Sequence, residues 1–394
     1  MSSDWKAVAT TTLIDAGALA IGDGFRAKND EMASTGLPFA RAGNIDGGNI
    51  HLEGADLLGP DSVEKAGEKI ARPGDSLFTS KGTVGRFAYV GESTPPFVYS
   101  PQICYWRVLD RSILEPEFIY FWLQGPESWE QLRALKGQTD MADYVSLADQ
   151  RQMKITLPPI DEQRRIAGVL AALENSIRVN AKLSNGLLQA GGALFDSACD
   201  ESADEVIVDD VVTFHNKHRV PLSAQQRAEM PGPYPYYGAT GIFDYVDRFL
   251  FDGTFVLVGE DGSVVQDGGS PVTQYVWGKF WVNNHAHVLT GLGISTELAY
   301  LALTRADVRA HITGAVQPKL SMGNLRSVQL RIPGPSSRSR LEVTLKPVFS
   351  LIRSKRAEAA TLAQLRDALL PKLVSGEVPV PNGYEPVERL GLAP

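Results

Sequence analysis

Cysteine is nearly missing from this chain of 394 residues, since it occurs only at Cys104 and Cys199. Two thiols so far apart, neither in a Cys-x-x-Cys pair, argue against a disulfide framework and against a cysteine-ligated zinc site. No run of about 18 apolar residues occurs, and the first residues show no basic segment ahead of an apolar one. These absences predict a cytoplasmic protein without a membrane-spanning helix.

The sequence motifs of several enzyme classes are missing as well. No Gly-x-x-x-x-Gly-Lys-Ser/Thr loop occurs, which argues against nucleotide-driven movement. An adenine methyltransferase needs an acidic or amide residue before a Pro-Pro pair, but the two Pro-Pro pairs follow Thr94 and Leu157. The acidic residues around Asp61 lack the Glu-x-Lys pair of a nuclease strand. We therefore expect no catalytic site in this chain.

Basic residues are in the minority, with 38 Lys and Arg against 46 Asp and Glu and a formal net charge of -8. This balance disfavours a chain that holds nucleic acid by itself. It does not exclude nucleic-acid binding, because phosphate contacts depend on local basic patches and on partner subunits.

Histidine could supply a metal site at one place only. His285 and His287 stand two residues apart on an expected strand, and His215 and His218 lie upstream. Zinc sites take three or four ligands with ordered spacing, and no cysteine accompanies these residues. We expect ordinary polar residues of strands or loops here, and no metal.

An internal repeat organises the chain. Residues 144–195 align without a gap to residues 319–370, at an offset of 175 that pairs, for example, Pro158 with Pro333. Two looser matches lie upstream: residues 37–48 resemble residues 234–245, and residues 72–85 resemble residues 251–264. The chain therefore contains two copies of one unit, each a globular domain followed by a helix.

The helical end of each copy carries a heptad pattern, in which apolar residues at positions a and d line one side of a helix. Asn180 and Lys355 interrupt the pattern at the same heptad position, and polar residues in the seam can set register or orientation. The pattern predicts that the two helices pair with each other along a seam. The predicted seam residues are Ile166, Leu170, Leu173, Ile177, Leu187, Leu194, Leu341, Leu345, Val348, Ile352, Leu362 and Leu369.

The residues upstream of each helix are of mixed α and β character. Residues 206–214 and 253–265 combine β-branched and aromatic residues with Gly and Asp turns, whereas residues 113–125 and 294–312 have the pattern of amphipathic helices. We expect an α+β protein with a pseudo-two-fold repeat and two long helices that pair as a coiled coil. The expected parts are domain 1 (1–156), the first long helix (157–199), domain 2 (200–331), the second long helix (332–378) and a tail (379–394).

Short motifs, taken in order, resemble the specificity subunits of type I restriction-modification systems. PGDSLFTSKGTVGR and FDGTFVLVGEDGS resemble a strand-turn segment of that family's target-recognition domains, and SPQICYW and NNHAHVLT the strand that follows. ITLPPIDEQRRIAGVLAALENSI resembles the start of the first conserved helix, and LRDALLPKLVSGEV the end of the second. The resemblance extends over nearly the whole chain.

The resemblance implies a non-catalytic subunit. Its two helices would run antiparallel, and each domain would read one half of a bipartite target in double-stranded DNA. Methylation of adenine and cleavage would belong to modification subunits, two in number, and to restriction subunits. S-adenosylmethionine, ATP and Mg²⁺ would then bind those partners.

The second helix departs from the family pattern. It begins with PGPSSRSRLE in place of the acidic-Gln start in DEQRR, and Pro347 lies well inside it. An internal proline removes a backbone hydrogen bond and can kink a helix. We therefore expect impaired helix pairing near the start of the second helix.

Candidate DNA contacts in the first domain lie in and near one turn. Lys81 and Arg86 are the best candidates for phosphate or guanine contacts, because basic side chains hold phosphates and donate to guanine. The neighbouring candidates are Ser80, Gly82, Thr83 and Gln102.

The corresponding turn of the second domain is acidic and consists of Glu260, Asp261, Gly262 and Ser263. An acidic side chain accepts from the N4 amino group of cytosine but repels phosphate, so the two domains should read different sequences. The further candidates are Tyr236, Tyr237, Asn283, His285, Gln317 and Lys319. The heptads alone also allow another function, a coiled-coil scaffold that binds protein partners without reading DNA sequence.

Overall fold

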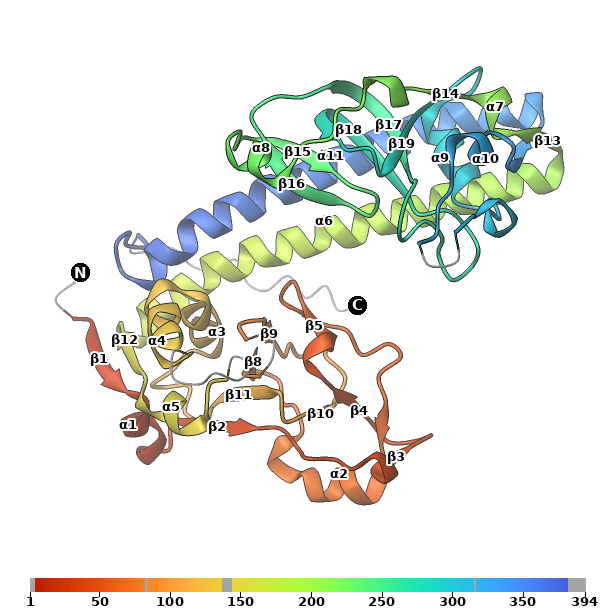
Figure 1. Ribbon diagram of the computed structural model, residues 1–394. Helices are drawn as coiled ribbons and strands as arrows, with labels where there is room; N and C mark the ends of the chain where they lie inside the picture. Colours follow the sequence, from red (N-terminus) through yellow and green to blue (C-terminus); the bar gives the residue numbers. More distant parts are fainter. Residues whose placement is uncertain (1–3, 82–83, 137–143, 315–316, 382–394) are drawn as a thin grey trace. The chain divides into compact units, whose positions relative to one another are not determined.

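The computed structural model describes residues 4–81, 84–136, 144–314 and 317–381. The chain forms two compact units, of which unit 1 comprises residues 1–178 and 360–394 and unit 2 comprises residues 179–359. Each unit therefore combines one globular domain with a part of each long helix, α6 (Ile160–Glu201) and α11 (Pro335–Val374), as Figure 1 shows.

The first domain precedes α6 and is built on an antiparallel sheet with strand order β2-β11-β8-β9. Its strands are β2 (Leu19–Asp23), β8 (Ser76–Thr79), β9 (Phe87–Tyr89) and β11 (Ile103–Val108). A second sheet has the order β10-β4-β7-β3, with β3 (Met32–Ala33), β4 (Leu37–Ala40), β7 (Leu57–Leu58) and β10 (Val98–Tyr99). Two pairs of strands complete the set: β5 (Ile45–Asp46) with β6 (Asn49–Ile50), and β1 (Lys6–Ala9) with β12 (Lys154–Leu157).

The helices of the first domain are α1 (Thr10–Asp15), α2 (Pro60–Ala66), α3 (Pro116–Gln124), α4 (Pro126–Lys136) and α5 (Leu147–Gln152), with short 3-10 turns η1 (Asn29–Glu31), η2 (Ala42–Asn44) and η3 (Gly67–Lys69). Helices α1, α3 and α5 contact the main sheet, whereas α2 packs against the second sheet. Helix α3 starts with Pro116 at its first turn and buries nearly all its side chains. Trp122 of α3 lies 5.8 Å, between ring centres, from Trp106 of β11.

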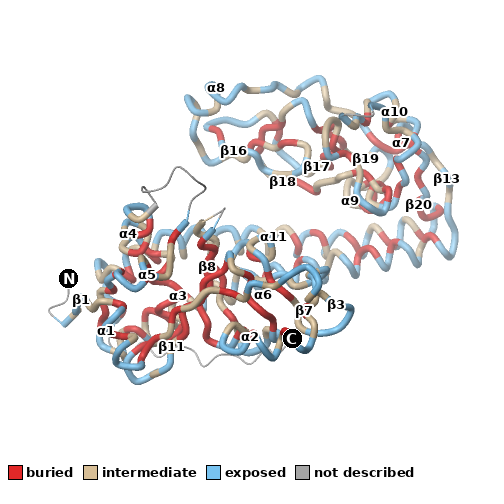
Figure 2. Tube along the Cα trace, turned by 60° about the horizontal axis from the view of Figure 1, so that its bottom comes forward, coloured by how far each residue is buried: buried red, intermediate tan, exposed pale blue. Residues whose placement is uncertain are grey.

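The core of unit 1 extends into both long helices. Ile166 and Leu170 of α6, and Leu373 and Val374 of α11, are buried in the same cluster as Trp106. Figure 2 shows the buried segments of this core around β8, β11 and α3. Because a helix must bury its apolar side, the first domain holds the start of α6 and the end of α11.

The second domain lies between α6 and α11 in the sequence and repeats this plan. Its strands are β13 (Ala203–Ile207), β14 (Val212–Phe214), β15 (Tyr234–Tyr237), β16 (Ile242–Val246), β17 (Phe251–Gly259), β18 (Thr273–Val282), β19 (Ala286–Gly291) and β20 (Gln329–Pro333). The main sheet has the order β14-β19-β17-β18-β15-β16, and β13 pairs with β20. The helical segments are α7 (Val208–Val211), η4 (Asn216–His218), α8 (Ala224–Ala228), α9 (Thr296–Leu303), η5 (Arg309–His311) and α10 (Met322–Arg326).

The core of unit 2 also includes parts of both long helices. Phe195 of α6 and Leu341, Leu345 and Phe349 of α11 are buried with residues of the second domain. The ring of Phe349 meets that of Tyr275 on β18 edge to face, with centres 5.0 Å apart. The second domain therefore holds the end of α6 and the start of α11.

Contacts within each unit show that α6 and α11 run antiparallel. In unit 1, Glu174 of α6 lies 3.5 Å from Arg366 of α11, between Oε1 and Nη1. In unit 2, the Ser337 hydroxyl of α11 donates to Glu201 of α6 over 3.0 Å. Residue numbers rise along α6 as they fall along α11. The helix pairing predicted by the heptads and the antiparallel direction implied by the family resemblance are both confirmed.

The two polar residues that interrupt the heptads meet at one place. Asn180 is only 5% exposed and hydrogen-bonds to Glu358, which also accepts from Lys355 Nζ over 2.8 Å. The hydrogen bond from Lys355 is the main cause that lowers the pKa of Glu358, and the hydrogen bond from Asn180 adds to it. A polar layer of this kind favours one register of the helix pair over others.

Burial along the helices follows the predicted seam except at one residue. Ile166, Leu170, Leu341, Leu345 and Ile352 are buried, and the half-buried seam residues are Leu173, Ile177, Leu187, Val348, Leu362 and Leu369. The assignment of Leu194 is wrong, because that residue is 43% exposed, whereas its neighbour Phe195 is 2% exposed. A strict seven-residue repeat drifts by about 20° per heptad on an ordinary helix, which moves the buried side by one residue over four heptads.

The expected disturbance at Pro347 is also wrong. Helix α11 continues through this residue, and Leu345 before it and Phe349 after it are buried. Pro347 lies on the exposed side, and Val343, whose carbonyl loses its helical partner, is 76% exposed. Water can therefore satisfy the carbonyl that proline leaves without a donor.

Candidate nucleic-acid interface

Four residues of the first domain meet where β8 ends and β11 begins. The Ser80 amide donates to the carbonyl of Gln102 over 2.9 Å, and the Ser80 carbonyl accepts from the amide of Val145 over 3.1 Å. Lys81 forms an isolated bridge with Tyr144, and its ammonium group lies 5.0 Å from the centre of the Tyr144 ring. We call Ser80, Lys81, Gln102 and Tyr144 the first strand-end cluster.

The first strand-end cluster is joined to the loop between β4 and β5. Arg86 Nη1 donates to the carbonyl of Ile45 over 3.2 Å, and the amide of Ala42 donates to the side-chain oxygen of Gln102 over 3.5 Å. Arg86 and Gln102, two of the DNA-contact candidates, therefore lie in the same region as Lys81.

The candidates of the first domain differ in exposure. Lys81 and Gln102 are exposed and Arg86 is partly buried, so their polar groups can reach a ligand. Ser80 is 1% exposed, which corrects its expected role from a contact residue to a support of the cluster. Gly82 and Thr83 lie outside the described residues.

The second domain contains a matching arrangement where β17 ends and β19 begins. The Glu260 amide donates to the carbonyl of His285 over 2.8 Å, and the Glu260 carbonyl accepts from the amide of Leu320 over 2.9 Å. Asp261 forms an isolated bridge with Lys319. We call Glu260, Asp261, His285 and Lys319 the second strand-end cluster.

The two clusters are equivalent in strand register as well as in hydrogen bonding. Thr79 lies opposite Ile103 in the first domain, and Gly259 lies opposite Ala286 in the second. Lys81 therefore corresponds to Asp261, an offset of 180. The alignment of residues 72–85 with 251–264 assumed an offset of 179, so it was wrong by one residue.

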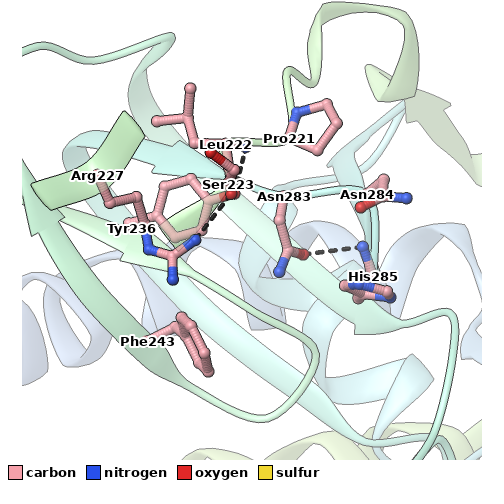
Figure 3. A pocket seen from close by; sticks show the side chains of 9 residues that line it. All are labelled: Pro221, Leu222, Ser223, Arg227, Tyr236, Phe243, Asn283, Asn284 and His285. Carbon is pink, nitrogen blue, oxygen red and sulfur yellow. Dashed lines mark hydrogen bonds between the residues drawn. The ribbon is translucent and has the colours of Figure 1, made fainter. Parts of the chain in front are cut away.

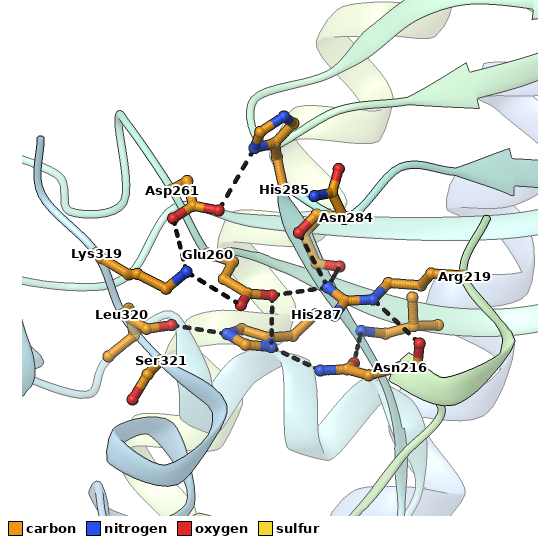
Figure 4. Close-up of polar contacts among 12 residues, drawn as sticks. Asn216, Arg219, Glu260, Asp261, Asn284, His285, His287, Lys319, Leu320 and Ser321 are labelled. Carbon is orange, nitrogen blue, oxygen red and sulfur yellow. Dashed lines mark hydrogen bonds and ion pairs between the residues drawn. The ribbon is translucent and has the colours of Figure 1, made fainter. Parts of the chain in front are cut away.

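The carboxylates of the second strand-end cluster are compensated by neighbouring cations (Figure 4). Arg219 Nη1 lies 2.7 Å from Glu260 Oε2, and Lys319 Nζ lies 3.1 Å from Asp261 Oδ1. The hydrogen bond to Asp261 is the main cause that raises the pKa of Lys319. His285 Nδ1 lies 3.4 Å from Asp261 Oδ2. The acidic turn is therefore locally close to neutral.

The second strand-end cluster packs on a buried, neutral histidine, His287. His287 is fully buried, and its Nε2 lies 2.7 Å from the Leu320 carbonyl, so Nε2 must carry a proton. The Asn216 carbonyl oxygen accepts from the amide of Val288, which leaves its NH₂ group to donate to His287 Nδ1 over 2.8 Å. Burial is the main cause that lowers the pKa of His287. These bonds assign a structural role to His287.

Two adjoining hollows lie beside the second strand-end cluster, with volumes of about 520 and 310 Å³. Both are lined by Phe243, Asn283 and His285, and Figure 3 shows the larger hollow. Tyr236 lines the larger hollow, but it is 1% exposed and its hydroxyl accepts from the amide of Leu222, which corrects its expected role from a contact residue to a support of the hollow. The hollows combine aromatic walls with amide and imidazole groups, as a surface that contacts nucleobases requires.

The other candidates of the second domain are less closely associated with the cluster. Tyr237 packs against the ring of Phe280, and the Gly262 amide donates to the carbonyl of Pro318. Ser263 and Gln317 are exposed.

The structure adds residues that the sequence reasoning missed. Tyr144 belongs to the first strand-end cluster, and the repeat contained a signal for it, because the offset of 175 pairs it with Lys319. Arg227 lies over the rings of Tyr236 and Phe243, at 5.3 and 4.9 Å from their centres. Phe243 itself is 68% exposed, and no spacing in the sequence pointed to either residue.

One protein-family model matches both halves of the chain. The model described as "type I restriction modification DNA specificity domain" matches residues 14–189 and 201–355. The chain belongs to this family. Each matched stretch includes one strand-end cluster and most or part of the long helix that follows it.

Individual relatives agree with the family assignment. A Haemophilus influenzae protein named as a type I restriction enzyme specificity subunit is 33% identical over 145 residues, which are 36% of this chain and 37% of that protein. This match therefore spans little more than a third of that relative. The Methanocaldococcus jannaschii type I restriction enzyme MjaIX specificity subunit is 20% identical over 355 residues, or 81% of each chain.

A solved structure shows the same fold. The crystal structure of the S subunit of the type I restriction-modification system from M. genitalium gives a TM-score of 0.57 over 95% of this chain and 97% of that chain, at 16% identity. Within the described ranges of the present chain, no helix is long and apolar enough to cross a membrane. The same described residues contain no group of three His, Cys, Asp or Glu placed to hold a metal ion.

Proposed function

We propose that this chain is the non-catalytic DNA sequence-specificity subunit of a type I restriction-modification complex. In this proposal each domain reads one half of a bipartite target in double-stranded DNA. The observation that carries it is the presence of two equivalent strand-end clusters, each with exposed polar side chains at the same place in a repeated domain. A duplicated reader in one chain is suited to a target with two separate halves.

The chemistry of the complex belongs to partner subunits in this proposal. Two modification subunits would methylate adenine, and restriction subunits would translocate and cleave the DNA. S-adenosylmethionine, ATP and Mg²⁺ would bind to those subunits. Family membership supports this division of labour.

A selection from random duplex DNA tests the proposal. The full chain, together with its modification subunit, is incubated with a randomised pool, and the bound DNA is sequenced. We expect a motif of two short conserved halves separated by a spacer of fixed length. Recovery of no motif, with the modification subunit still bound, would instead support a coiled-coil scaffold that does not read sequence.

A domain exchange tests the modular part of the proposal. Residues 1–156 are replaced by the corresponding domain of another family member, and the selection is repeated. We expect one half of the motif to change and the other half to remain. A change in both halves would contradict independent reading by the two domains.

A further inference from the structure

The two strand-end clusters share their backbone but not their side chains. Both have the same pair of backbone hydrogen bonds and the same isolated bridge. Any difference in what the clusters recognise must therefore come from side chains. The equivalent pairs with exposed side chains in at least one domain are Lys81 and Asp261, Gln102 and His285, and Tyr144 and Lys319.

In each cluster the central side chain, Lys81 or Asp261, contacts at least one other member of the cluster. In the first domain, the Lys81 ammonium group lies over the Tyr144 ring. In the second domain, the Asp261 carboxylate lies between Lys319 and His285, at 3.1 and 3.4 Å. Lys81 is held in place by Tyr144. Asp261 is held in place by Lys319, which is the equivalent of Tyr144, and also by His285.

The central side chains have opposite hydrogen-bonding capacity. Lys81 can only donate, and guanine presents the acceptors O6 and N7 in the major groove. The Asp261 carboxylate can only accept, and cytosine and adenine present the amino donors N4 and N6. Two carboxylate oxygens have about four acceptor sites, so the pairs with Lys319 and His285 leave capacity for a base.

We propose that these three pairs of positions are specificity-determining residues, and that they make the two half-sites different. Lys81 with Gln102 and Tyr144 selects a guanine in the first half-site. Asp261 with His285 and Lys319 selects a base with an exocyclic amino group in the second. This inference rests on the proposed function and assigns the bases that each domain would read.

A threefold exchange in the full chain tests the inference. Lys81→Asp, Gln102→His and Tyr144→Lys give the first domain the side chains of the second strand-end cluster. The selection from random duplex DNA, with the modification subunit, is run on the parent and the variant. The control is Lys6→Gln on β1, which makes the same net change in charge, a loss of one positive charge, outside the cluster.

We expect the variant to lose the guanine preference at one position of the first half-site and to gain a preference for an amino-bearing base there. Loss of one specific base contact corresponds to about a 5- to 150-fold change in discrimination. The second half-site should remain unchanged, and it serves as an internal measure of a folded and active chain. The control should keep the parental motif.

Three results would overturn the inference: an unchanged first half-site, equal changes in both half-sites, or the same change in the Lys6→Gln control. If the exchanged domain fails to fold and the first half-site disappears, the single variant Lys81→Gln decides, because Lys81 is exposed and its replacement leaves the core intact. Retention of the guanine preference in that variant would refute the assignment. A parent chain that selects no motif would refute the proposed function itself.

Discussion

Replacement of Arg107 should destabilise unit 1 far more than replacement of an exposed arginine close by. Arg107 on β11 is 5% exposed, and Asp75, which directly precedes β8, is fully buried. The guanidinium group makes two hydrogen bonds of 2.7 Å to the two oxygens of Asp75. Arg107 also donates to the carbonyl of Ile70 over 3.0 Å, so it ties β11 to the segment that leads into β8.

The magnitude follows from what Arg107→Met leaves behind. The Asp75 carboxylate stays buried, with a hydrogen bond of 2.6 Å from the Tyr99 hydroxyl and one of 2.9 Å from the Arg72 amide. Burial and the neighbouring carboxylate raise the pKa of Tyr99, so its hydroxyl keeps its proton and remains a donor. Two neutral donors do not replace a paired cation, and removal of one partner of a buried ion pair costs about 3–5 kcal/mol.

Urea unfolding of the full chain provides the assay, read as the transition of unit 1. Arg72→Met is the matched control, because Arg72 has a half-exposed side chain and pairs with Glu68 over 2.8 Å at the surface, where a pair contributes about 0–1 kcal/mol. The double variant Asp75→Leu with Arg107→Met removes both charges and should recover most of the lost stability. Equal effects of Arg107→Met and Arg72→Met would refute this account of the buried pair.

Three further predictions concern the helices and the second domain. Phe195→Ala should lower the free energy of unfolding in urea by about 3–5 kcal/mol, and Leu194→Ala by less than about 1 kcal/mol. A larger effect of Leu194→Ala would contradict the assignment of Phe195 to the buried side. Since burial lowers the pKa of His287, unit 2 should lose stability as the pH falls below 6.5, where the unfolded chain takes up the proton more readily. His287→Gln should weaken this pH dependence, and an unaltered pH profile would contradict it. Insertion of seven residues after Lys182 and after Ala357 adds about 10 Å to both helices and should lengthen the target spacer by about 3 base pairs in the selection, whereas an unchanged spacer would argue against the helices as its ruler.

The sequence was informative about the parts of the fold that repeat. The offset of 175 correctly relates Tyr144 to Lys319, because their backbone bridges occupy the same place in the two domains. The heptads also predicted that the two long helices pair, whereas their antiparallel direction came from the family resemblance. Both features depend on patterns that extend over many residues, so a single exception such as Leu194 did not hide them.

Features that depend on one contact between distant residues could not be predicted. Asp75 and Arg107 are 32 residues apart, and nothing in their spacing indicates that strand pairing brings them together. The register of β17 was missed by one residue because two glycines, Gly74 and Gly253, aligned well although neither belongs to the strand-end clusters. The expectation for Pro347 was wrong although the predicted seam residues Leu345 and Val348 leave Pro347 on the exposed side, where water can satisfy the carbonyl that proline frees.

The acidic net charge of -8 is not concentrated at the second strand-end cluster, because its two carboxylates are paired with cations. Glu260 and Asp261 would repel phosphate if they were free, but Arg219 and Lys319 lie within 2.7 and 3.1 Å of them. Charges paired at this distance cancel over a few ångströms, so a duplex would meet directional hydrogen-bonding groups and not a negative surface. The same pairing removes Lys319 as a free phosphate contact. The second domain is therefore suited to reading base edges, and the affinity for the DNA backbone would have to come from other basic residues or from the partner subunits.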